Sequence, residues 1–124
     1  MKQHSPQFLH LVTQAQKRVK ALSAQILKEK IDQHEELYLI DVREDHEWAT
    51  GHIPTAIHIG KGIIERDIEK TIPDFNAPIV LYCSGGFRGA LTADSLQQMG
   101  YQEVYSLENG SQGWQDSGFK LTSL

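Results

Sequence analysis

Short apolar runs that alternate with helix-like segments are the feature that most restricts the fold of this chain. The runs "LYLIDV" at 37–42 and "APIVLYC" at 77–83 have the length of buried strands rather than of helices. We also expect strands at 18–23, 56–59 and 103–107. Parallel strands need crossover connections, which the helix-like segments between the runs can supply. The sequence therefore predicts an α/β fold with a central, mostly parallel five-stranded sheet and helices on both faces.

The segments between these strands carry apolar side chains at helical spacing. Ser5 and Pro6 are typical of a helix start. The apolar face of this first helix is expected to consist of Phe8, Leu11, Val12 and Ala15. Further helices are expected at 24–31, 61–72, 89–100 and 111–118, with one helical turn at 47–50. At 124 residues the chain can bury one core and is too short for two, so we expect a single domain.

The composition excludes several classes of function. Hydrophobic residues make up 40% and charged residues 23%, which is typical of a soluble globular protein. A net charge of -4 argues against a general polyanion binder, so nucleic acid is not an expected partner. The sequence has neither an apolar run of membrane-spanning length nor the pattern of a signal peptide, so we expect a cytoplasmic protein without a membrane partner.

Cys83 is the only cysteine of the chain and stands between an apolar strand and two glycines, Gly85 and Gly86. It cannot form an internal disulfide, so it is a buried apolar side chain, a reactive thiol or an intermolecular partner. Ligands of parallel α/β sheets bind beyond the carboxyl ends of the strands, where Cys83 is expected. The glycine loop and the helix start offer N–H groups that favour a thiolate and a bound anion. Arg88 adds a planar cation, and together these features favour a reactive thiol.

Three motifs in order resemble those of the rhodanese family of sulfurtransferases. They are "LIDVREDHEWATGHIPTAIHI" at 39–59, the six-residue loop "CSGGFR" at 83–88, and "GYQEVYSLENGSQGW" at 100–114. The resemblance implies the same α/β fold and transfer of sulfane sulfur through a cysteine persulfide. It leaves 1–18 as an N-terminal helical extension and makes 19–124 the rhodanese-like domain.

The resemblance also assigns roles to individual residues. Cys83 is expected to be the catalytic nucleophile, and Arg88 the anchor for an anionic sulfur donor. The expected substrate-binding residues are Ser84, Gly85, Gly86, Phe87, Arg88 and Gly89. Asp41 and Arg43 match positions that hold the fold and its loops together, so we treat them as structural.

The chain departs from the family pattern at three positions. Thr55 replaces a glycine, Asn109 replaces the first of two glycines, and Gly89 replaces a serine or alanine. Asparagine tolerates left-handed backbone better than most residues, so Asn109 need not disturb its turn. Gly89 is expected to loosen the helix start. The family pattern therefore does not predict which sulfur donor this loop prefers.

Several residues outside the loop are further candidates for a functional role. Lys61 could add a second cation to an anion site, although most such lysines are solvated helix charges. The histidines His46, His52 and His58 lack a second thiol or a carboxylate pair at ligand spacing, so we expect no metal and interpret them as solvent-facing or turn-stabilising. Trp48 and Trp114 are expected to be packing anchors.

The sequence thus favours an enzyme, a sulfurtransferase without a cofactor. Thiosulfate or a persulfide donor is expected to load Cys83, and cyanide, a small thiol or a protein thiol to accept the sulfur. Because the chain has no second thiol, an external acceptor must discharge the persulfide. The alternatives are a cysteine-dependent phosphatase or arsenate reductase, whose loops have five residues between cysteine and arginine instead of four, and a non-catalytic rhodanese-like binding module.

Overall fold

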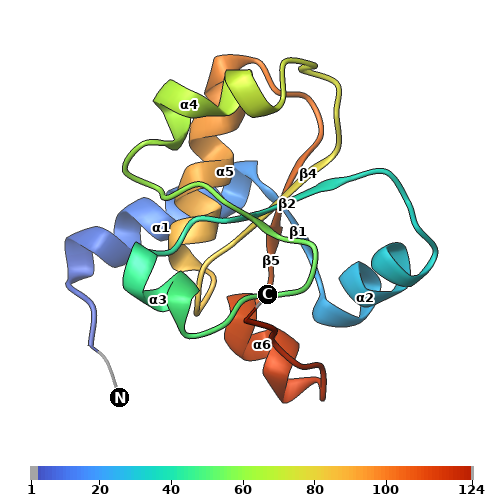
Figure 1. The fold of residues 1–124 in the computed structure, drawn as a ribbon. Helices are drawn as coiled ribbons and strands as arrows, with labels where there is room; N and C mark the ends of the chain where they lie inside the picture. Colours follow the sequence, from blue (N-terminus) through green and yellow to red (C-terminus); the bar gives the residue numbers. More distant parts are fainter. Residues whose placement is uncertain (1–2, 124) are drawn as a thin grey trace.

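The computed structural model describes residues 3–123, so the predicted ranges 1–18 and 19–124 are covered except at positions 1, 2 and 124. Figure 1 shows helices packed around a central sheet. The strands are β1 (Lys20–Leu22), β2 (Tyr38–Asp41), β3 (Ile57–His58), β4 (Ile79–Tyr82) and β5 (Val104–Leu107). The helices are α1 (Pro6–Arg18), α2 (Ala24–Asp32), α3 (Asp45–Ala49), α4 (Ile64–Thr71), α5 (Phe87–Met99) and α6 (Gly110–Asp116).

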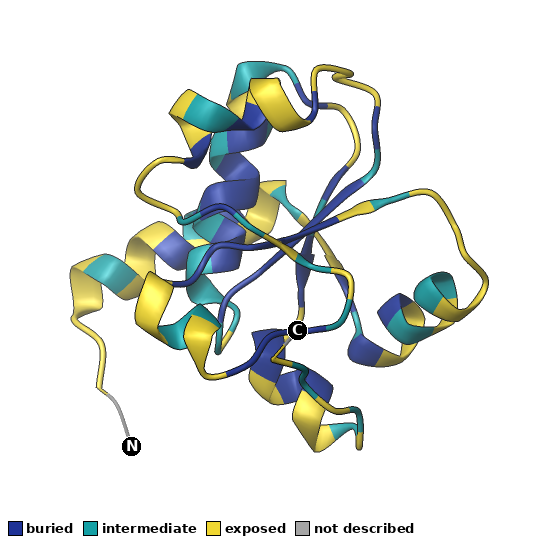
Figure 2. Cartoon of the chain, in the orientation of Figure 1, coloured by how far each residue is buried: buried dark blue, intermediate teal, exposed yellow. Residues whose placement is uncertain are grey.

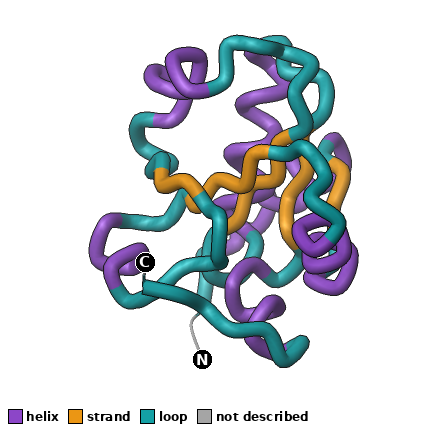
Figure 3. Tube along the Cα trace, turned by 45° about the vertical axis from the view of Figure 1, so that its right-hand side comes forward, coloured by secondary structure: helices purple, strands orange, loops and turns teal. Residues whose placement is uncertain are grey.

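The sheet has the order β1-β5-β4-β2-β3, and every described strand pair is parallel. Figure 3 shows the strands in the interior, with helices on either side of them. This confirms the predicted α/β class and the five-stranded sheet. The carboxyl ends of β2 and β4 lie side by side, because Asp41 pairs with Tyr82. The segments that follow these two strands are therefore neighbours.

Alternate residues of β4 face two separate cores. Ile79 and Leu81, followed by Cys83, face the core that α4 and α5 cover. Val80 and Tyr82 face the core that α2 and α6 cover. Because both faces of β4 are buried, its sequence is continuously apolar rather than alternating. Figure 2 shows this burial along the strands and on the inner side of α5.

Helix α1 packs along α5 and begins as predicted, since Ser5 Oγ accepts a hydrogen bond from the Phe8 N–H at 3.2 Å. Val12 and Ala15 are buried, and Phe8 is half-buried. Leu11 was expected on the same face, but it is 59% exposed. The stripe that contacts the domain follows the spacing 8, 12, 15, which turns Leu11 toward solvent.

The carboxyl end of α1 is fixed to α5 by polar contacts. The Arg18 guanidinium donates to both carboxylate oxygens of Asp94, at 2.9 and 2.8 Å. Gln97 Nε2 donates to the Arg18 carbonyl at 3.0 Å. The helix is therefore held at its end as well as along its face, and in its first turn the Phe8 ring lies 6.2 Å from the ring of Phe87 at the start of α5.

Helices α3 and α4 begin at other residues than predicted. Helix α3 spans Asp45–Ala49 instead of 47–50, because Glu44 and Glu47 form a capping box at its start. Helix α4 begins at Ile64 instead of Lys61, since the Ile63 N–H bonds the Gly60 carbonyl in a tight turn before it.

Two departures from the family pattern lie at left-handed backbone. Thr55 has φ 75° and Asn109 has φ 58°, so both replace glycine where glycine is favoured. Asn109 occupies its turn as expected.

Among residues 3–123, the helices are all too short or too polar to cross a membrane.

Candidate functional site

Cys83 follows β4 directly and lies beneath the loop that leads into α5. Its sulfur accepts hydrogen bonds from the N–H groups of Gly86, at 3.1 Å, and Gly89, at 3.4 Å. Gly86 has φ 106°, a conformation that costs other residues energy. Backbone N–H groups at a helix start stabilise negative charge. The loop geometry is thus suited to a thiolate or to a sulfur atom bound to it.

The loop is held from its other side by α6. The Ser111 N–H donates to the Cys83 carbonyl at 2.8 Å, and the Gln112 N–H donates to the Ser84 carbonyl at 3.0 Å. A side chain at Gly110 would collide with the Cys83 carbonyl oxygen. The closing segment of the chain therefore sets the shape of the cysteine loop.

Arg88 is paired with a carboxylate that the sequence analysis did not identify. Its Nη1 and Nη2 donate to the two Glu47 oxygens at 2.7 and 3.0 Å, and Nη2 also donates to Ser84 Oγ at 2.9 Å. The Arg88 hydrogen bond lowers the pKa of Glu47 to about 2. The pKa of Arg88 is raised, chiefly by the Glu47 hydrogen bond, which outweighs the opposite effect of burial.

A cavity of about 760 Å³ opens above Cys83. Its lining in the described chain consists of His4, Phe8, Glu44, His46, Glu47, Cys83, Ser84, Gly85, Phe87 and Arg88. Gly86 and Gly89, which were predicted with them, contribute N–H groups to the sulfur instead. Lys61 does not line this cavity.

Half of this lining was not predicted. Glu44, His46 and Glu47 come from α3 and its cap, and the Glu-aromatic pair in the motif at 39–59 was a signal for Glu47. His4 and Phe8 come from the segment that we placed outside the domain. Their place at the cavity depends on how α1 docks on α5, and the sequence pattern gives no signal for that.

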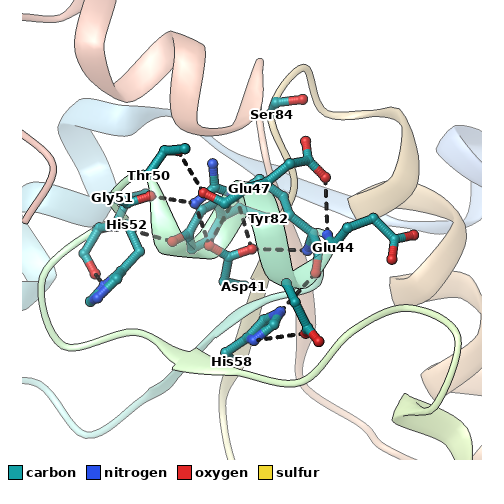
Figure 4. Close-up of polar contacts among 12 residues, drawn as sticks. Asp41, Glu44, Glu47, Thr50, Gly51, His52, His58, Tyr82 and Ser84 are labelled. Carbon is teal, nitrogen blue, oxygen red and sulfur yellow. Dashed lines mark hydrogen bonds and ion pairs between the residues drawn. The ribbon is translucent and has the colours of Figure 1, made fainter. Parts of the chain in front are cut away.

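Asp41 and Arg43 form a buried ion pair beneath the site, as the structural interpretation predicted. Arg43 Nη2 donates to Asp41 Oδ2 at 2.7 Å and to the Gly51 carbonyl at 2.6 Å, as Figure 4 shows in part. Tyr82 lies beside them and its hydroxyl accepts from the Ile53 N–H at 3.0 Å. This network ties the end of β2 to the segment after α3.

His52 and His58 are not solvent-facing, but a ring nitrogen of each contacts a backbone carbonyl, at 3.2 and 2.7 Å, which agrees with the turn-stabilising interpretation. His52 is 5% exposed and stacks on Trp48, with ring centroids 3.6 Å apart. His58 is half-buried and stacks on Trp48 at 4.9 Å. Stacking on an indole gives a histidine ring a packing role that its sequence neighbours do not indicate. Trp114 is 2% exposed, as expected of a packing anchor.

Comparison with known proteins gives matches over most of the chain. The model of the Rhodanese-like domain matches residues 23–117. A candidate sulfurtransferase of Bacillus subtilis, YtwF, is 41% identical over 97 residues, which are 78% of this chain and 91% of YtwF. The thiosulfate sulfurtransferase GlpE of Actinobacillus pleuropneumoniae is 30% identical over 83 residues, which are 67% of this chain and 75% of GlpE.

Solved structures share the fold at lower identity. A thiosulfate sulfurtransferase of Pseudomonas aeruginosa has a TM-score of 0.84 at 24% identity, over 93% of this chain and 22% of that one. RPA3614 of Rhodopseudomonas palustris, described as a possible tyrosine phosphatase, has a TM-score of 0.86 at 23% identity, over 98% of this chain and 99% of that one. The strand order, the cysteine loop and the family match agree, and the chain belongs to the family of the Rhodanese-like domain.

Proposed function

We propose that this protein is a sulfurtransferase that carries sulfane sulfur on Cys83 as a persulfide. The donor is thiosulfate or a persulfide compound, and the acceptor is cyanide, a small thiol or a protein thiol. The observation that carries the proposal is the pair of N–H groups, from Gly86 and Gly89, directed at the Cys83 sulfur. The sulfurtransferases among the relatives support it further.

The proposed reaction has two displacement steps at sulfur. The Cys83 thiolate attacks the sulfane sulfur of thiosulfate, a new S–S bond forms to Cys83, and the S–S bond of thiosulfate breaks with release of sulfite. The negative charge of the persulfide then lies on its terminal sulfur, where loop N–H groups can stabilise it. In the second step cyanide attacks that terminal sulfur, thiocyanate leaves, and the Cys83 thiolate is restored.

The substrate-binding roles predicted for the loop belong to this proposal. Gly86 and Gly89 hold the sulfur through their N–H groups, and Ser84, Gly85 and Phe87 line the cavity through which substrates reach it. Arg88 provides positive charge beside the sulfur.

Mass spectrometry of the intact protein tests the proposal. Incubation with a sulfane-sulfur donor is expected to add one sulfur atom to Cys83, and cyanide is expected to remove it. Cys83→Ser is the matched control, because a hydroxyl has nearly the size of a thiol and is a far weaker nucleophile at neutral pH. An unchanged mass with thiosulfate, thiosulfonates and organic persulfides alike would contradict the proposal.

Hydrolysis of an aryl phosphate tests the phosphatase alternative. Ser84, Gly85, Gly86 and Phe87 are the only residues between Cys83 and Arg88, which makes the loop one residue shorter than those of cysteine-dependent phosphatases. A smaller ring of N–H groups suits one sulfur atom better than a tetrahedral oxyanion. Phosphatase activity without sulfur loading would reverse the assignment. If the protein had neither activity, the non-catalytic binding module would be the better interpretation.

A further inference from the structure

Three rings from two separate segments line one side of the cavity above Cys83. His4 lies 5.1 Å from Phe8 and 5.2 Å from Phe87, and Phe8 lies 6.2 Å from Phe87, all measured between ring centroids. We call these three residues the aromatic wall. Phe87 belongs to the cysteine loop, whereas His4 and Phe8 lie before residue 23, where the family match begins.

The charge of the cavity is poorly matched to a small dianion. Its lining contains two carboxylates, Glu44 and Glu47, and the guanidinium of Arg88, which gives a formal charge of -1 with the histidines and the Cys83 thiol counted as neutral. Both terminal nitrogens of Arg88 already donate to Glu47. A doubly charged donor such as thiosulfate therefore meets a site whose cation is neutralised by a bound carboxylate.

The size of the cavity is also suited to a larger ligand. Its volume of about 760 Å³ falls within the range of sites that enclose organic molecules, roughly 300–1,000 Å³. Thiosulfate has five heavy atoms and would contact only the part of the cavity next to the sulfur. The aromatic wall would remain unused by such a donor.

We propose that the aromatic wall binds an apolar organic group of the sulfur donor. The preferred donor class is then a monoanion in which a terminal sulfane sulfur is attached to an aromatic or other apolar body, rather than thiosulfate. This inference rests on the proposed function and names the substrate class of the same site. It also gives His4 and Phe8 of the N-terminal segment a role in specificity.

Such a donor itself supplies the leaving group for the transfer of its terminal sulfur to Cys83. With an organic thiosulfonate, the Cys83 thiolate bonds to the terminal sulfur, the bond between that sulfur and the sulfonyl sulfur breaks, and a sulfinate leaves with the electron pair. One thiolate and one thiosulfonate anion thus become one persulfide anion and one sulfinate anion. The organic group stays on the sulfinate, so the wall can hold it throughout the step.

Two thiosulfonates that differ only in their organic group test the proposal. The first measured quantity is the ratio of kcat/KM for benzenethiosulfonate to kcat/KM for methanethiosulfonate. Dividing it by the ratio of the rates at which the two compounds react with a small thiolate in free solution removes their difference in intrinsic reactivity and gives the corrected ratio. The native protein is expected to give a corrected ratio of about ten or more, equivalent to about 1.4 kcal/mol. Phe8→Ala and His4→Ala are expected to lower it by about fivefold and twofold.

Leu11→Ala is the matched control, because it removes an exposed apolar side chain from the same helix away from the cavity. Its corrected ratio is expected to equal that of the native protein. A partly unfolded variant lowers both rates equally, so the ratio still reports on the wall. A native ratio near one, or a ratio that neither Phe8→Ala nor His4→Ala changes, would overturn the inference. Failure of every donor to load Cys83 would instead overturn the proposed function.

Discussion

Arg88 and Glu47 are the charged pair next to the Cys83 sulfur, and the charge of Glu47 can be removed with little change of size. Glu47→Gln removes one negative charge and keeps an oxygen that accepts from Arg88. We expect the KM for thiosulfate to fall by about threefold to tenfold, because a nearby charge contributes about 1 kcal/mol even when water screens it. Steady-state kinetics with thiosulfate and cyanide measure this effect.

Arg88→Ala is expected to act in the opposite direction. It leaves two carboxylates at the cavity, so the KM for thiosulfate should rise by about tenfold or more. Arg88→Lys should recover part of the loss, because lysine keeps the charge without the planar fork. If Glu47→Gln and Arg88→Ala shifted the KM in the same direction, the pair would act through loop structure rather than charge.

The pKa of Glu47 also predicts how the pair responds to acid. Its value falls from 4.5 to about 2 in the folded protein, mainly because of the Arg88 hydrogen bond. A lowered pKa contributes stability that is complete above pH 4.5 and is lost as the pH falls through about 2. The difference in unfolding free energy between the native protein and Glu47→Gln should therefore be constant from about pH 8 to 5, at about 1–3 kcal/mol.

Chemical denaturation at a series of pH values measures this difference. It should shrink steadily below about pH 4.5. A difference that already changes between about pH 7 and 6 would show that another group, such as a histidine, controls the pair.

The sequence predicts the cysteine loop of the candidate site more completely than the other side chains that line the cavity. Cys83 and Arg88 follow from one continuous stretch, in which the strand, glycines and helix start are all visible. Glu47 lies 41 positions from Arg88, so their contact depends on the adjacent ends of β2 and β4. His4 reaches the cavity only through the docking of α1, which is a property of the folded chain.

At the level of elements, α6 and the cysteine loop behave as one unit. Gly110→Ala would place a methyl group against the Cys83 carbonyl, and it would also strain a backbone at φ 54°. We expect a loss of about 2–4 kcal/mol of stability and a strong loss of sulfur transfer, because the loop must move to make room. Thermal unfolding and donor kinetics measure the two effects.

Gly118→Ala is the matched control for that variant. Gly118 also has a positive φ, of 90°, but a side chain there meets nothing within 4 Å. Gly118→Ala should lower the free energy of unfolding by about 1–2 kcal/mol through backbone strain. The activity per folded molecule should not change. Equal losses of activity in both variants would mean that α6 does not shape the loop.

The element boundaries show where local sequence signals were sufficient. The start of α1 was predicted from Ser5 and Pro6, because the cap is a contact between near neighbours. The start of α3 was missed, although its capping box between Glu44 and Glu47 is also local. Helix α3 has no buried residue, so the capping box is the main signal that its sequence carries. Leu11 was misplaced because only the packed partner determines which side of a helix is buried.

At the scale of the whole molecule, the net charge of -4 opposes the approach of anionic donors. Raising the ionic strength from about 10 mM to about 150 mM shortens the range of this repulsion. We therefore expect kcat/KM for thiosulfate to rise by about twofold, and that for methanethiosulfonate, a monoanion, to rise less. A fall with added salt would mean that attraction by Arg88 dominates the encounter.

The hydrogen bonds from α6 to the cysteine loop also have a consequence for the protein during its synthesis. Cys83 leaves the ribosome before Ser111 and Gln112, whose N–H groups hold the carbonyls of the loop. Strand β1 likewise cannot form its pairing with β5 until β5 has been synthesised. We therefore expect Cys83 to be an exposed thiol on the nascent chain, open to alkylation and oxidation, and to become the buried residue of the folded loop only when α6 has docked.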